Sequence, residues 1–96
     1  MPKRFFEPND TAVFTTKFVL NEGKDITVVY HDADDGSWQF HSDDDYGDFA
    51  EVGKIVGLGE ILQIDNSILE IADLPIGYFA RRTSKGSGWE IRKISN

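Results

Sequence analysis

The sequence predicts an α+β fold: an antiparallel sheet of about five strands, in the order β-β-β-α-α-β-β, with two short helices packed on one face. Three observations predict it. Apolar and polar residues alternate in several short segments, apolar residues in the middle of the chain follow helical spacing, and turns rich in glycine and aspartate separate the segments. A length of 96 residues fits a single domain covering 1–96.

The first three strands are predicted in the first half of the chain. Residues 1–11 contain Pro2 and Pro8, so we interpret them as a loose N-terminal lead-in. Strands are predicted over 13–20 and 26–31. The loop between them is too short for a parallel crossover, which needs about a dozen residues, so the two strands should pair as an antiparallel hairpin.

A third strand is predicted over 38–41, where alternation places Trp38 and Phe40 on the same face. Segment 48–53 fits neither a helix nor a strand pattern. Within the glycine-rich stretch 53–59, residues 57–59 are interpreted as a tight entry into the first helix.

Two helices and two strands complete the predicted fold. Leu58 and Ile61 share one face of the first helix, and Ser67 with Glu70 fits a capping box that would begin the second. Pro75 ends that second helix. The last two strands are predicted over residues 76–82 and 89–94.

Charge is unevenly distributed along the chain. The net charge is −7, from 17 acidic and 10 basic residues, which opposes binding to nucleic-acid phosphates or to an anionic membrane. Residues 32–51 hold eight acids and no base, whereas residues 80–96 hold five bases and one acid. The sequence therefore predicts a polarised surface, with acidic loops on either side of the third strand.

The composition excludes several classes of protein. There are no cysteines, which excludes disulfides, cysteine-based zinc sites and cysteine nucleophiles. No stretch approaches the ~18 consecutive apolar residues of a membrane span, and the N-terminus does not resemble a signal peptide. We therefore expect a cytoplasmic protein, and no motif indicates a cofactor.

The acidic segments are the candidate binding site for a protein partner. The simpler interpretation is that Trp38 is a core anchor and that the acidic runs are solvated loops, but a rigid aromatic residue beside carboxylates is also typical of an interface. The predicted contact residues are Asp34, Asp35, Trp38, Asp43, Asp44, Asp45 and Tyr46.

Two histidines suggest an alternative, a transition-metal site. His31 and His41 stand at matching ends of two predicted strands and could hold a metal together with nearby aspartates if those strands pair. The simpler interpretation is that both are solvent-facing strand residues. The aspartates do not match the spacing of a calcium-binding EF-hand loop.

Two segments resemble a known family. Residues 35–46, DGSWQFHSDDDY, resemble a D-x-G-W-x-F segment that is followed by a short acidic stretch and a tyrosine in a family of small bacterial domains. Residues 58–77 resemble that family's helix, its restart and its L-P-x-G exit into a strand. The sequence departs from the pattern at Ser37, inserted between glycine and tryptophan, and at Asn66, where the family has proline.

Members of this family are predicted to be immunity proteins, which neutralise toxins in bacterial polymorphic toxin systems. The resemblance implies a bacterial, intracellular α+β binding domain without catalytic residues. Our leading hypothesis is therefore a non-enzymatic protein that blocks a basic surface on a toxin. The alternatives are a metal-binding domain or small metal-dependent enzyme using His31 and His41, and a housekeeping interaction module; the oligomeric state stays open.

Overall fold

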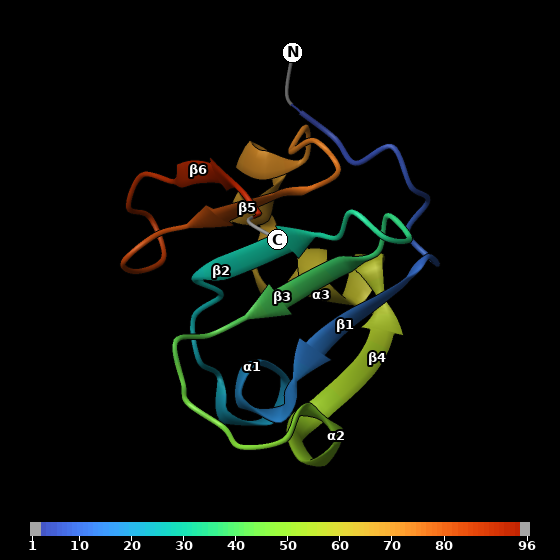
Figure 1. Cartoon of the computed structure of the whole chain (residues 1–96). Coiled ribbons are helices and arrows are strands. Elements are labelled where there is room, and N and C mark those ends of the chain that lie inside the picture. The colour runs from blue at the N-terminus through green and yellow to red at the C-terminus, as the bar shows by residue number, and fades with distance from the viewer. Residues whose placement is uncertain (1–2, 95–96) are drawn as a thin grey trace.

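The computed structural model describes residues 3–94, and within them six strands form one mixed sheet in the order β4-β1-β3-β2-β5-β6 (Figure 1). The strands are β1 (Ala12–Thr16), β2 (Val28–His31), β3 (Trp38–His41), β4 (Gly53–Gly57), β5 (Tyr78–Arg81) and β6 (Glu90–Lys93). The helices are α1 (Lys17–Glu22), α2 (Phe49–Val52), α3 (Leu58–Ile64) and the 3₁₀ helix η1 (Asn66–Ile71). The α+β class is confirmed, but a purely antiparallel sheet of about five strands is wrong.

The sheet is mixed because β1 pairs in parallel with β3, through Phe14 and Gln39. The predicted hairpin between segments 13–20 and 26–31 is therefore wrong. The chain leaves the sheet after Thr16 and forms α1, which ends at Gly23 in the left-handed conformation (φ 68°), whose backbone N–H donates to the Phe18 carbonyl. A short apolar run fits a helix as well as a strand, so periodicity alone did not separate them.

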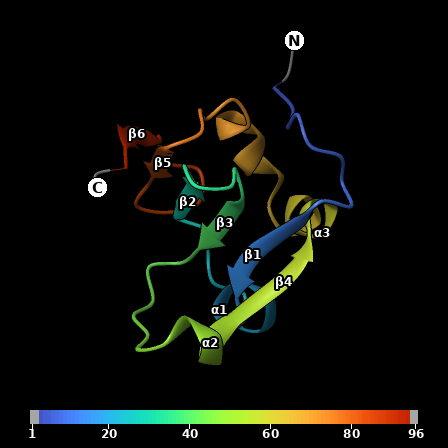
Figure 2. The same cartoon turned by 45° about the vertical axis from the view of Figure 1, so that its right-hand side comes forward.

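Strand β4 was not predicted and forms one edge of the sheet beside β1 (Figure 2). It runs antiparallel to β1, from Ala12 opposite Gly57 to Thr16 opposite Gly53. A side chain at position 53 would collide with the ring of Phe49, so glycine permits α2 to turn directly into β4. Gly53 and Gly57 thus begin and end an edge strand, and Gly57 is also the N-cap of α3, so the predicted tight entry into a helix at residues 57–59 is confirmed.

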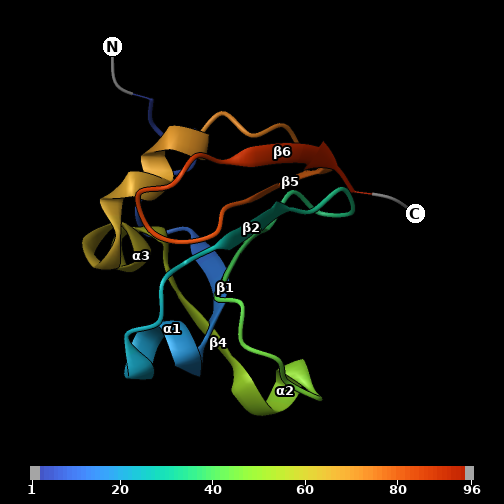
Figure 3. The same cartoon turned by 90° about the vertical axis from the view of Figure 1, so that its left-hand side faces the viewer.

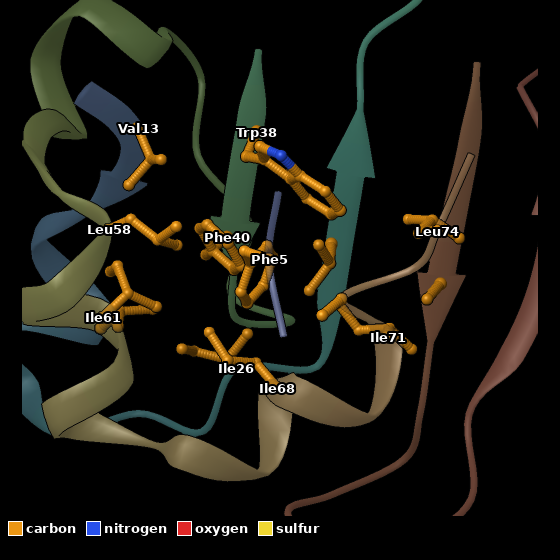
Figure 4. Close-up of a cluster of buried hydrophobic side chains, with 14 residues drawn as sticks. Phe5, Val13, Ile26, Trp38, Phe40, Leu58, Ile61, Ile68, Ile71 and Leu74 are labelled. Carbon is orange, nitrogen blue, oxygen red and sulfur yellow. The ribbon is translucent and has the colours of Figure 1, made fainter. Parts of the chain in front are cut away.

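The hydrophobic core lies between the sheet and the helices α3 and η1, which cover the same side of the sheet (Figure 3). Trp38 and Phe40 share the buried face of β3, as predicted. Figure 4 shows Phe5 beside them; its ring centroid is 4.9 Å from that of Trp38 and 6.3 Å from that of Phe40. Residues 3–11 form no helix or strand, yet Phe5 anchors them to the core. Residues 1 and 2 of the predicted lead-in lie outside the described part.

Helix η1 begins differently from the predicted capping box. Asp65 is its N-cap and accepts hydrogen bonds from the backbone N–H (3.0 Å) and the hydroxyl (2.6 Å) of Ser67. Glu70, the expected reciprocal cap, instead accepts a hydrogen bond from the Trp89 indole at 3.1 Å. The helix start was placed correctly, but the capping residue is Asp65.

Arg82 joins η1 to the sheet from a fully buried position. Its Nη2 lies 2.8 Å from Asp65 Oδ2, and its Nε donates to the Ile26 carbonyl at 3.0 Å. Its guanidinium also lies over the ring of Trp89, 4.1 Å from the centroid. The Arg82 side chain thus connects three places in the chain: Ile26 shortly before β2, Asp65 at the start of η1 and Trp89 just before β6.

The pKa of Asp65 reflects these contacts. Burial raises it, but the hydrogen bonds from Ser67 and the positive charges of Arg82 and Lys85 outweigh burial and hold the pKa below its ordinary value. Asp65 is therefore ionised at neutral pH.

Candidate functional site

The face of the sheet opposite α3 and η1, called the open face from here on, carries a second set of strand side chains. They point there because side chains alternate along a strand and paired residues share a face. By the register of the sheet they include Phe14, Val28, Tyr30, Gln39, His41, Ile55, Phe79 and Arg81. Unlike the core face, this surface combines aromatic and polar groups.

A hollow of about 920 Å³ lies where the ends of β2, β3 and β5 meet the loop after β3. Tyr30, Gln39 and His41 line it from the sheet, and the acidic loop, residues 42–47, lines one wall. This loop leaves β3 and runs toward α2 (Figure 1). Arg81 and Glu90 contribute to the lining from β5 and β6. The hollow is thus bordered by residues from both halves of the chain.

Four of the predicted contact residues line this hollow: Asp43, Asp44, Asp45 and Tyr46. Asp44 is half-buried and accepts a hydrogen bond from the Ser42 hydroxyl at 2.8 Å, while Asp43 and Asp45 are exposed. Within residues 3–94 the three carboxylates form no ion pair. Their negative charge is therefore available to a partner.

Asp34 and Asp35 lie elsewhere, in the turn at the opposite end of β2 and β3. The register places this turn beyond the His31–Trp38 pair, whereas the acidic loop follows the pair formed by Val28 and His41. Hydrogen bonds from the backbone and hydroxyl of Ser37 lower the pKa of Asp35, so the carboxylate stabilises its own turn. The two acidic segments therefore form two separate surfaces.

Trp38 is a core residue, with 2% of its surface exposed. Its indole Nε1 donates to Glu7 at 2.9 Å, and its ring stacks on His31 with centroids 3.9 Å apart. The interpretation of Trp38 as a core anchor fits these contacts. In this conformation the side chain can support a binding surface but cannot itself contact a partner.

The two histidines lie on opposite faces of the sheet. His31 pairs with Trp38 on the core face, and its Nδ1 lies 2.7 Å from the Leu74 carbonyl. His41 is on the open face. Both are buried, so the solvent-facing interpretation is wrong, and the pairing of β2 with β3 does not bring them together. Among the described residues no three histidine, aspartate or glutamate side chains are grouped to hold a metal ion.

His41 has a defined role in the open face. Gln39 donates its amide to Asp32 at 2.6 Å, so its carbonyl oxygen accepts from His41 Nε2 at 2.9 Å. Burial lowers the pKa of His41 more than the charge of Asp32 raises it. A neutral imidazole, held as the Nε2–H tautomer, therefore packs among the aromatic rings at neutral pH.

These aromatic rings form a continuous layer that sequence reasoning missed. Centroid distances are 5.6 Å from Phe79 to Tyr30, 5.8 Å from Tyr30 to His41 and 6.3 Å from His41 to Tyr46. Phe49 of α2 lies 6.2 Å from Tyr46 and extends the layer. The available signal was alternation, since Tyr30 and Phe79 stand next to the core residues Val29 and Ala80 and therefore face the other side of the sheet.

A second, smaller hollow of about 480 Å³ lies near the N-terminal segment. Phe6, 99% exposed, and Ile76, 58% exposed, line it together with Asp35 and Asp73. The prediction did not single out Phe6 or Ile76, because isolated apolar residues on a surface are ordinary in soluble domains.

The structure is an α+β domain whose single sheet has one helix-covered face and one open face. The chain belongs to a known family: residues 13–92 match the family described as the Immunity protein Imm33 domain. This match confirms the resemblance found in the sequence. No curated protein and no solved structure matches the chain.

Membership of an immunity-protein family supports a protein-binding role and implies a protein partner such as a toxin. Among the described residues, no helix has the length and apolar character required to cross a membrane.

Proposed function

We propose that this protein neutralises a toxin, without catalysis, by binding a basic surface of that toxin with its acidic loop. The observation that carries the proposal is the wall of Asp43, Asp44 and Asp45 along a hollow of about 920 Å³, next to the 40% exposed ring of Tyr46. In this proposal the aspartates are contact residues and Tyr46 is an aromatic contact at the edge of the hollow.

Electrostatic steering is the first step of the proposed mechanism. Carboxylates that form no ion pair in the free protein attract a cationic partner and raise the association rate more than they lower the dissociation rate. Asp34 and Asp35, at the far end of β3, would add to this long-range attraction and contact only a partner that spans the strand. Trp38 would hold β3 in place from the core.

Occlusion is the second step. A toxin that acts on an anionic substrate such as a nucleic acid needs a basic surface, and an acidic protein bound there would block the substrate. We place this encounter in the cytoplasm, which agrees with a chain that contains no cysteine.

The test is a charge-neutralising variant, Asp43→Asn, Asp44→Asn and Asp45→Asn together, assayed against the purified toxin encoded beside the gene. Loss of three carboxylates should lower the association rate constant about tenfold or more at low salt. It should also weaken the dependence of that rate on ionic strength. Rapid-mixing or surface-binding kinetics at several salt concentrations would measure both quantities.

A matched control removes three charges from other exposed sites, through Asp10→Asn, Glu22→Gln and Glu60→Gln. This control has the same net charge as the test variant but keeps the acidic loop. If both variants bind alike, only net charge matters and the acidic loop is not the site. Unchanged rates in the test variant would refute the proposal directly.

A further inference from the structure

The open face carries aromatic rings that neither α3 nor η1 covers. Tyr30 and Phe79 are half-buried, Tyr46 is exposed, and His41 lies beneath them with 7% of its surface exposed. Rings that stabilised only the interior would lie between the sheet and its helices, as Phe5 and Phe40 do. The open face is therefore an aromatic sheet surface that, within residues 3–94, Phe49 of α2 covers at the His41 and Tyr46 end and that stays partly exposed at Tyr30 and Phe79.

The charges around these rings indicate what kind of group would cover them. The acidic loop supplies three carboxylates along one wall of the hollow. On the opposite wall Arg81 stands next to Glu90, whose carboxylate accepts from Arg92 at 3.2 Å. The hollow is therefore negative on the loop side and carries one net positive charge on the other side, so a cation would sit against the loop.

We infer that the open face receives an arginine side chain from the protein partner, stacked on Tyr46 and Tyr30 and paired with the carboxylates of the acidic loop. The inference rests on the proposed function and specifies the chemistry of the partner. A guanidinium is planar, stacks on aromatic faces and binds a carboxylate with two parallel hydrogen bonds. A lysine ammonium is more strongly hydrated and lacks the planar fork, so it fits this combination less well.

The protein already contains the same arrangement in its interior. The Arg82 guanidinium lies 4.1 Å from the ring centroid of Trp89 and 2.8 Å from an Asp65 oxygen. A ring and a carboxylate together thus hold one guanidinium. The open face presents the same two groups, a tyrosine ring and aspartates, and within residues 3–94 these aspartates pair with no cation.

Thr27 supports a polar contact in the same hollow. It lines the wall and is 4% exposed, and its hydroxyl has no hydrogen-bonding partner within residues 3–94. A buried hydroxyl without a partner is unfavourable, so a donor or acceptor from a bound segment would stabilise this site.

The first experiment uses a blocked Gly-Arg-Gly peptide as the probe, titrated into the ¹⁵N-labelled protein and followed by NMR. Chemical shifts should change at Tyr46, Tyr30 and His41. The citrulline peptide, which is neutral and of the same shape, should bind about tenfold more weakly or not at all. Equal shifts from both peptides, or shifts confined to other faces, would overturn the inference.

The second experiment uses the toxin and two substitutions of one exposed ring. Tyr46→Ala should raise the dissociation constant about tenfold, whereas Tyr46→Phe keeps the ring face and should stay within about twofold of the wild type. Equal losses for both variants, or none for Tyr46→Ala, would overturn the inference. If the acidic loop is required while both Tyr46 variants bind normally, the proposed function stands and only the arginine site fails. If neither the wild-type protein nor any of its variants binds the toxin, the proposed function itself fails.

Discussion

Arg82 offers the most direct test of how this fold is held together. Its side chain has no exposed surface and makes hydrogen bonds to Asp65, Ser67 and the Ile26 carbonyl. Arg82→Ala would remove these bonds together and leave the Asp65 carboxylate buried without its main counter-ion. Removal of one partner from a buried ion pair costs about 3–5 kcal/mol.

The free energy of unfolding sets the scale of that loss. Domains have roughly 0.05–0.15 kcal/mol per residue, which for 96 residues gives about 5–14 kcal/mol. Arg82→Ala should therefore remove about a fifth or more of the total. With a urea dependence of about 1.5 kcal/mol/M, the midpoint should fall by roughly 2–3 M.

Urea denaturation followed by tryptophan fluorescence would measure this change, because Trp38 is buried in the core and Trp89 lies against Arg82. The control is Arg81→Ala, which removes the neighbouring exposed arginine and should change the free energy of unfolding by less than about 0.5 kcal/mol. A loss below about 1 kcal/mol for Arg82→Ala would show that the buried pair is not a main source of stability.

Two further outcomes are expected. Because the pKa of Asp65 is depressed in the folded state, its stabilisation is present above the ordinary carboxyl range and is lost as the pH falls below about 4. The difference in unfolding free energy between the wild type and Asp65→Asn should therefore shrink between pH 6 and pH 3, and a constant difference would contradict this. Phe5→Ala should lower the free energy of unfolding by about 3–5 kcal/mol, because Phe5 is only 8% exposed. The control Phe6→Ala changes a 99% exposed ring and should lower it by less than about 0.5 kcal/mol. Equal effects of the two substitutions would show that Phe5 does not anchor the N-terminal segment to the core.

The sequence predicted those elements in which pattern and boundaries agree. Residues 38–41 alternate, follow a turn, and become β3 with Trp38 and Phe40 inward. Helix α3 follows from the spacing of Leu58 and Ile61, both buried in the structure. In each of these two elements, the apolar residues that the spacing places on one face are the residues that face the core.

The missed elements are those whose neighbours lie far away in the chain. Alternation shows which face a residue occupies but not which strand lies next to it, so the parallel pairing of β1 with β3 was not predictable. Strand β4 has glycine at both ends, a 67% exposed Ile55 and an only partly buried Val56, so no alternating apolar pattern predicts it as a strand.

The candidate site was predictable in part for the same reason. The acidic loop is visible as a charge run, whereas the open face depends on the register of β2, β3 and β5. Tyr30 meets His41 only because β2 and β3 are offset so that Val28 lies opposite His41.

The position of β1 in the sheet also has a consequence for how the protein is made. β1 leaves the ribosome before every other strand, but its two neighbours are β3 and β4, and β4 begins only at Gly53. The β2–β3 hairpin can close early through its short turn, whereas β1 needs contacts between distant parts of the chain, which form slowly because a longer loop must be closed. We therefore expect Val13 and Phe14 to stay exposed until β4 has been synthesised, so that β1 is made before the other five strands and is among the last to be paired.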